Sequence, residues 1–165
     1  MTNAEAELAS FFAKYEPAIA KLGKAFRAKL RTRLPGLSEI VYVYEKQGSL
    51  VIAYSPTEQG YEAPCSLALD SHGAKLYFAQ GPLLSKADPN KLLQGSGKKV
   101  RFVPLSSVAD FDRPEIEALI AAVSEQAKLR LDSNAKGSII LKAESQKQRA
   151  QGATKAARPA SKGRR

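Results

Sequence analysis

The sequence predicts an α+β fold in which an antiparallel sheet of five or six strands carries an N-terminal and a C-terminal helix packed on one face. Between Glu39 and Gln80, four short runs rich in Val, Ile, Tyr and Leu are separated by turn residues, which is the pattern of an antiparallel meander. Before this stretch the apolar residues recur at helical spacing. After it come a loop, a fifth strand, a second helical segment and a basic tail.

The composition is that of one soluble domain. The chain has 165 residues, of which 44% are apolar and 25% charged, close to the average for globular proteins. No apolar run approaches the ~20 residues that a membrane-spanning helix needs. The start of the chain, with Glu5 and Glu7, lacks the layout of a signal peptide. We therefore expect a cytoplasmic protein with a single domain over residues 1–143 and a flexible tail over 144–165.

The segment from Ala4 to Leu34 is predicted to be helical, because its large apolar residues recur every three or four positions. The stripe consists of Leu8, Phe11, Phe12, Tyr15, Ile19, Leu22, Phe26 and Leu30. Pro17 cannot donate a backbone hydrogen bond, so we expect either a kink or two helices, the second opening at Glu16-Pro17. Leu34-Pro35-Gly36 should end the helix.

A basic surface lies beside this stripe. It comprises Lys14, Lys21, Lys24, Arg27, Lys29 and Arg31. Two interpretations stay open for it: a solvated helix face, or a groove that faces an anion.

The first two predicted strands carry a possible ligand face. Ile40–Glu45 and Leu50–Tyr54 alternate so that Tyr42 and Tyr44 share one face of the first strand, and we expect Tyr54 to join them from the second. Such a face is either a half-buried sheet surface or an aromatic platform for a base or another flat ligand.

The third strand, Ala63–Asp70, contains the only cysteine of the chain. Cys65 lies on the opposite face of this strand from Asp70, the polar face that His72 would share. A catalytic pair of Cys65 and His72 is therefore not expected, and a small buried thiol is the better interpretation. Two interpretations are open for Asp70-Ser71-His72-Gly73: a turn, or a weak site for a hard metal ion. The preceding loop, Ser55 to Ala63, is acidic because of its two glutamates.

A glycine-rich stretch follows the fourth strand, Ala74–Gln80. Gly95-Ser96-Gly97-Lys98-Lys99 is not a P-loop, since Leu92 stands where that motif needs its first glycine and Lys99 where it needs Ser or Thr. Lys98, Lys99 and Arg101 are nevertheless candidates for binding an anion or nucleic acid. Val100–Pro104 reads as a fifth strand with Val100 and Phe102 inward and Arg101 outward.

The C-terminal helix is predicted from a capping box at Asp112 and Glu115, with Pro114 in the first turn and an end near Leu129. Its apolar stripe is Ile116, Leu119, Ile120 and Val123. Gly137–Lys142 is compatible with a last edge strand, although so short an apolar run is ambiguous.

The charge of the chain is concentrated at its end. The formal charge is +10, and the segment after residue 143 contributes seven basic residues and one acid, which leaves 19 basic and 15 acidic residues before it. The tail holds no large apolar residue and should be a flexible arm. Its basic residues, Lys147 and Arg149 among them, either solubilise the protein or contact nucleic acid.

The order of these segments resembles the YdhG-like family of small bacterial proteins of unknown function, whose fold is likened to that of frataxin. The matching pieces are Lys14-Tyr15, Pro17, Leu34-Pro35-Gly36, Thr57-Glu58, Ser66-Leu67-Ala68-Leu69, Asp88-Pro89 to Arg101, Ile140, Lys142 and Lys147-Gln148-Arg149. The resemblance implies two helices on an antiparallel sheet. It also implies iron as a ligand, because some members are labelled iron chaperones by analogy with frataxin. The residues to test for iron are Asp70, His72, Glu58 and Glu62.

No triad, paired carboxylates or metal cluster stands out, so we expect a non-catalytic binding protein for iron or a small ligand. The alternative is an anion or nucleic-acid binding module that uses the Gly-Ser-Gly-Lys loop and the tail. A third hypothesis, an enzyme acting on a small molecule, would need a deep pocket that contains Tyr42, Tyr44 and a strongly perturbed acid.

Overall fold

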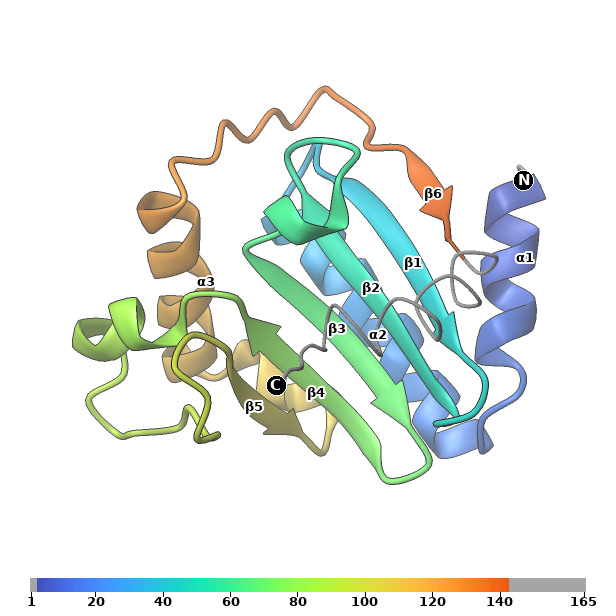
Figure 1. Cartoon of the computed structure of the whole chain (residues 1–165), viewed down its shortest axis with the longest axis horizontal. Coiled ribbons are helices and arrows are strands. Elements are labelled where there is room, and N and C mark those ends of the chain that lie inside the picture. Colours follow the sequence, from blue (N-terminus) through green and yellow to red (C-terminus); the bar gives the residue numbers. More distant parts are fainter. Residues whose placement is uncertain (1–2, 143–165) are drawn as a thin grey trace, which may run out of the picture.

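The computed structural model describes residues 3–142, so the predicted tail, with Lys147 and Arg149, lies outside the described residues. An α+β arrangement is confirmed, with a six-stranded sheet and three α-helices among the described residues (Figure 1). The elements are α1 (Asn3–Phe12), α2 (Pro17–Arg33), β1 (Ser38–Tyr44), β2 (Ser49–Ser55), η1 (Gly60–Glu62), β3 (Cys65–Asp70), β4 (Gly73–Phe78), η2 (Gly81–Ala87), β5 (Arg101–Leu105), η3 (Val108–Asp112), α3 (Pro114–Gln126) and β6 (Ile139–Leu141).

The sheet has the order β5-β4-β3-β2-β1-β6 and is mixed. The first five strands pair antiparallel, whereas β6 runs parallel to β1, with Ile140 opposite Ile40. The prediction of a purely antiparallel sheet is therefore wrong for the last strand. The reason is the return path: residues 127–138 cross one end of the sheet after α3, so the chain enters β6 from the end where β1 begins (Figure 1).

The N-terminal stripe forms two helices, as one of the two predicted alternatives required. Pro17 stands in the first turn of α2, where its missing N–H costs nothing, and α1 ends five residues earlier at Phe12. The stripe faces the core, and Leu8, Phe12, Phe26 and Leu30 are fully buried or nearly so. Apolar residues of α1, α2 and α3 join one core with the same face of the sheet.

The fifth strand is shifted by one residue from its prediction. Val103 lies opposite Leu76 and Phe102 opposite Tyr77, and residues paired in this way share a face. Val103 and Leu105 therefore point to the core, while Phe102 lies on the other face. The predicted inward placement of Val100 and Phe102 is wrong, and Val100 is exposed in the loop before the strand.

The apolar stripe of α3 is buried as predicted, but the helix begins differently. The capping box involves Ser107 and Asp110 of η3 instead of Asp112 and Glu115. The carboxylate of Asp112 accepts a hydrogen bond from Lys29 at 2.7 Å, which draws it toward α2. Pro114 stands in the first turn as predicted, and the helix ends at Gln126, before Leu129.

Candidate functional site

The sheet has one face without an α-helix among the described residues, and we call it the open face (Figure 1). Because directly paired residues share a face, the register gives its composition. One row across the strands is Tyr42, Val51, Ala68, Lys75 and Pro104, and the next is Ile40, Ala53, Ser66, Tyr77 and Phe102. Small side chains thus occupy the two middle strands, and aromatic side chains stand on both sides of them.

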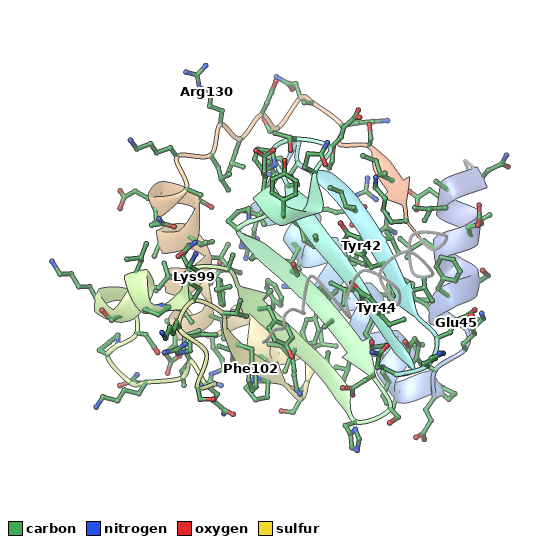
Figure 2. The ribbon with its side chains drawn as sticks, in the orientation of Figure 1. Tyr42, Tyr44, Glu45, Lys99, Phe102 and Arg130 are labelled. Carbon is green, nitrogen blue, oxygen red and sulfur yellow. The ribbon has the colours of Figure 1, made fainter. Side chains whose placement is uncertain are left out.

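The aromatic side chains of the open face form two pairs. The rings of Tyr42 and Tyr44 are stacked with centroids 6.2 Å apart, and those of Tyr77 and Phe102 lie 5.3 Å apart with a tilt of 40°. The ammonium of Lys75 lies 5.1 Å from the centroid of the Phe102 ring. Figure 2 shows the first pair along β1 and Phe102 across the sheet from it.

The predicted tyrosine face is correct for two of its three members. Tyr42 and Tyr44 share the open face, but Tyr54 is wrong: it pairs with Glu39, points under the helices and is 1% exposed. The pairing of Tyr77 with Phe102 was not predicted. Tyr77 shares a face with Lys75, as the pattern of its own strand indicates, whereas Phe102 was predicted to lie on the other face because of the one-residue error in β5.

A basic loop adjoins Phe102. Residues 81–100 carry Lys86, Lys91, Lys98 and Lys99 against a single acid, Asp88, whose carboxylate accepts hydrogen bonds from the backbone N–H groups of Leu92 and Leu93. Two backbone hydrogen bonds of 2.7 and 3.0 Å join Gln94 to Phe102 and fix the loop along the edge of β5. The loop thus runs along Phe102 through Gln94 and carries exposed lysines.

Of the predicted anion-binding residues, the three before residue 102 do not lie together. Lys98 and Lys99 are exposed in the basic loop. Arg101 pairs with buried Phe78 and lies on the helix side, where its aliphatic stem covers Gly81; a Cβ at Gly81 would stand 2.3 Å from Cγ of Arg101. Arg101 therefore lies on the face opposite Phe102.

The four predicted metal ligands do not form one site. Asp70 and His72 lie at the turn after β3, and Glu58 and Glu62 lie in the loop before it, so the length of the strand separates the two pairs. Among residues 3–142, no three His, Cys, Asp or Glu side chains come together as a metal site would require. Asp70 accepts a hydrogen bond of 2.7 Å from the His72 backbone N–H, and such a bond is typical of a turn. Glu62 accepts a hydrogen bond from the Thr57 hydroxyl.

A buried ionic cluster, absent from the sequence analysis, lies beneath α2. Arg27 donates two hydrogen bonds of 2.8 Å to the carboxylate of Glu39, and the hydroxyl of Tyr54 donates a third at 3.0 Å. Glu39 is 3% exposed. Burial raises the pKa of Tyr54 well above its ordinary value, and the neighbouring carboxylate of Glu39 raises it further. Because both oxygens of Glu39 have donors, the cluster joins the first two strands to α2.

The lone thiol is buried, as predicted. Cys65 is 1% exposed, and burial raises its pKa to about 12. A thiol without accessible thiolate is a poor nucleophile.

Comparison with protein-family models, curated proteins and solved structures gave no match. The resemblance to the YdhG-like family therefore stays a prediction based on the motifs of the sequence. In the part of the chain that the structure describes, no helix combines the length and the apolar composition needed to cross a membrane.

Proposed function

We propose that the protein is a binding module that takes single-stranded nucleic acid on the open face of its sheet. The observation that carries the proposal is the pair Tyr77 and Phe102, with the ammonium of Lys75 over the Phe102 ring and the basic loop fixed to the same residue. Aromatic rings offer stacking surfaces to bases, and lysines attract the phosphates between them.

The open face has the shape that a single strand requires. Tyr42 on β1 and Tyr77 on β4 are separated by three strand spacings, or about 14 Å. Between them, the half-buried Val51, Ser66 and Ala68 form a low floor on which a strand can lie, whereas Ala53 is buried with Ile40 and Ala63. Unpaired bases expose faces that an aromatic ring can cover, whereas bases inside a duplex are already stacked on each other, so we expect a preference for single strands.

Nucleic acid is a stronger proposal than iron for this arrangement. The acids predicted to bind iron lie at two ends of β3 and have no common pocket, whereas the aromatic and basic side chains of the open face adjoin one another. A frataxin-like fold stays a proposal. It is supported by the packing of the α-helices on one face of the sheet.

The test is fluorescence anisotropy with labelled oligonucleotides of about 12 nucleotides, a length within the range that one such platform covers. Replacing Tyr77 and Phe102 together by Leu should weaken binding by a factor of roughly ten or more, since one stacked base contributes about 1–3 kcal/mol. Tyr61→Leu is the matched control, because Tyr61 is 82% exposed and lies in η1. Equal affinity in the double variant and the control would refute the proposal.

The contribution of the tail is separated by a second comparison. The chain truncated after Ala143 should bind more weakly and with a smaller salt dependence, because fewer phosphates are neutralised. It should still lose affinity when Tyr77 and Phe102 are replaced. If truncation alone abolishes all binding, the tail and not the open face is the ligand site.

A further inference from the structure

A hollow lies away from the centre of the open face, at the end of the sheet where β1 turns into β2. We call it the hairpin pocket. It has a volume of about 420 Å³ and lies between the bend that joins α1 to α2 and the hairpin of β1 and β2. Its size falls within the range of roughly 300–1,000 Å³ that is typical of small-molecule sites. It reaches Tyr44 but does not include Tyr42, so it is not the pocket that the enzyme hypothesis required.

The bend and the hairpin are held together by one side chain. The hydroxyl of Tyr15 donates a hydrogen bond of 3.1 Å to the carbonyl of Gly48 in the hairpin turn. Phe11, from the last turn of α1, and Leu50, from β2, pack against the main core and close the inner end. The pocket therefore has a fixed frame made by elements that are distant in sequence.

The walls are aromatic. Phe11 and Tyr15 line the pocket from α1 and from the bend, whereas Tyr44 borders it from β1 with its ring stacked on Tyr42 on the open face. The face of an aromatic ring carries partial negative charge and attracts cations, most strongly where water is excluded. An ammonium already occupies such a position here, because Nζ of Lys14 lies 5.7 Å from the centroid of the Phe11 ring.

The lining of the pocket holds one charged residue of each sign. Of the charged residues at the pocket, Lys14 contributes one positive and Glu45 one negative charge. Asp70 is close enough to act on Tyr15: burial raises the pKa of the Tyr15 hydroxyl, and the carboxylate of Asp70 raises it further. Of these carboxylates only Glu45 lines the pocket, and the preference for a cation comes from the aromatic faces together with the ammonium that already lies over Phe11.

We propose that the hairpin pocket binds a small organic cation, an amine or a quaternary ammonium, between its aromatic walls. The ligand takes the place of the Lys14 ammonium over Phe11, and the flexible stem of Lys14 lets its charge move into solvent. The apolar groups of the ligand cover Leu50 and the ring faces, while the charge is stabilised by the rings and by the carboxylate of Glu45.

The test is an NMR titration of the full chain, followed at the amides of Tyr15, Gly48 and Ser49, with three probes. Choline carries the charge, 3,3-dimethylbutanol has the same shape without it, and benzoate has the opposite charge. Choline should bind roughly threefold to thirtyfold more tightly than dimethylbutanol, the range that a cation–aromatic contact supplies. Equal binding of these two probes, tighter binding of benzoate, or no binding of choline would each refute the proposal.

Variants of exposed residues test the proposal without the risk that a folding defect is taken for a loss of binding. Lys14→Gln leaves the fold intact because Lys14 is exposed, and it should strengthen choline binding by removing a competing ammonium. Glu45→Gln, also at an exposed residue, should weaken it. Tyr77→Leu, on the far side of the open face, should leave choline binding unchanged, which separates this site from the nucleic-acid proposal. Lack of any change in Lys14→Gln and Glu45→Gln would contradict the electrostatic argument.

Discussion

The hydroxyl of Tyr54 donates a hydrogen bond of 3.0 Å to the carboxylate of Glu39, and both side chains are buried between the sheet and α2. Arg27 supplies the compensating charge through two hydrogen bonds of 2.8 Å. A buried carboxylate is tolerated only when it is paired in this way. The relationship explains how the first strand of the sheet accommodates an acid within its covered face.

The Glu39 cluster predicts that removing the carboxylate lowers the free energy of unfolding more than removing the Tyr54 hydroxyl does. Glu39→Ala leaves Tyr54 without its acceptor and Arg27 with only Glu5, at 3.2 Å, as its carboxylate partner, and should destabilise the protein by about 2–3 kcal/mol. Tyr54→Phe removes one hydrogen bond and should cost about 1–2 kcal/mol. Urea unfolding measures both, with Glu7→Gln on the exposed side of α1 as the control. Equal losses for Glu39→Ala and Glu7→Gln would show that the cluster does not stabilise the fold.

The buried thiol predicts a loss of stability at alkaline pH. Burial raises the pKa of Cys65 from 9.0 to about 12, so above pH 9.0 the unfolded chain releases a proton that the folded chain retains. This stabilising contribution is complete below the unfolded pKa and decreases as pH rises, at a rate of up to about 1.4 kcal/mol per pH unit. Tyr54, whose pKa is also raised, adds to the effect at higher pH.

Thermal unfolding between neutral pH and roughly pH 10 measures this loss. In Cys65→Ala the decrease should be smaller than in the native chain, because the thiol no longer contributes and only tyrosines with raised pKa values, such as Tyr54 and Tyr15, still do. The thiol should also react with a disulfide reagent only after urea unfolds the protein. Rapid reaction of the folded chain would contradict the burial of Cys65.

Local patterns in the sequence predicted much of the fold, because helical stripes, turns and proline effects depend on neighbouring residues. Pro17 divides the N-terminal stripe for a reason that acts within one helical turn, and the stripe of α3 follows from its own spacing. The relations between strands were harder to predict. Tyr54 was assigned to the wrong face because the face of one strand relative to the next depends on register, which the residues of a single strand do not contain.

The same limit explains the candidate site. Phe102 was predicted to point inward, and only the pairing of β5 with β4 places it beside Tyr77. The parallel direction of β6 follows from the path of residues 127–138, which have no periodic pattern. Tyr42, Tyr44, Lys98 and Lys99 could be named from the sequence, but their partners across the sheet could not.

A pair of ions between α2 and α3 should contribute little at neutral pH and nothing in acid. Arg33 donates hydrogen bonds to Glu117, with Nε at 2.8 and 3.1 Å from its carboxylate oxygens, and both side chains are about one-third exposed. The hydrogen bond from Arg33 lowers the pKa of Glu117, so its stabilisation is present above the ordinary pKa of 4.5 and is lost as pH falls through the lowered value. Solvent screening limits the coupling to about 0.3–1 kcal/mol.

A double-mutant cycle with Arg33→Gln and Glu117→Gln measures this coupling at neutral pH and again well below the ordinary pKa of Glu117. The coupling energy should vanish in acid, where the carboxyl is protonated. A coupling that persists unchanged in acid would mean that packing and not charge joins the two helices.

Gly60 in η1 predicts a steric link between the acidic loop and the open face. A Cβ at this position would lie 1.9 Å from the hydroxyl oxygen of Tyr42 and 2.8 Å from Cζ, distances that no side chain tolerates. Gly60→Ala must therefore displace either η1 or the ring, at a cost of about 1–3 kcal/mol. Gly97→Ala is the control, since its nearest contact would be an ordinary 3.5 Å.

Tyr42→Leu should restore most of the stability lost in the Gly60→Ala background, because the atoms that clash are then absent. Urea unfolding of the double variant measures this recovery. If Gly60→Ala costs the same with or without the tyrosine, the loop does not rest on Tyr42.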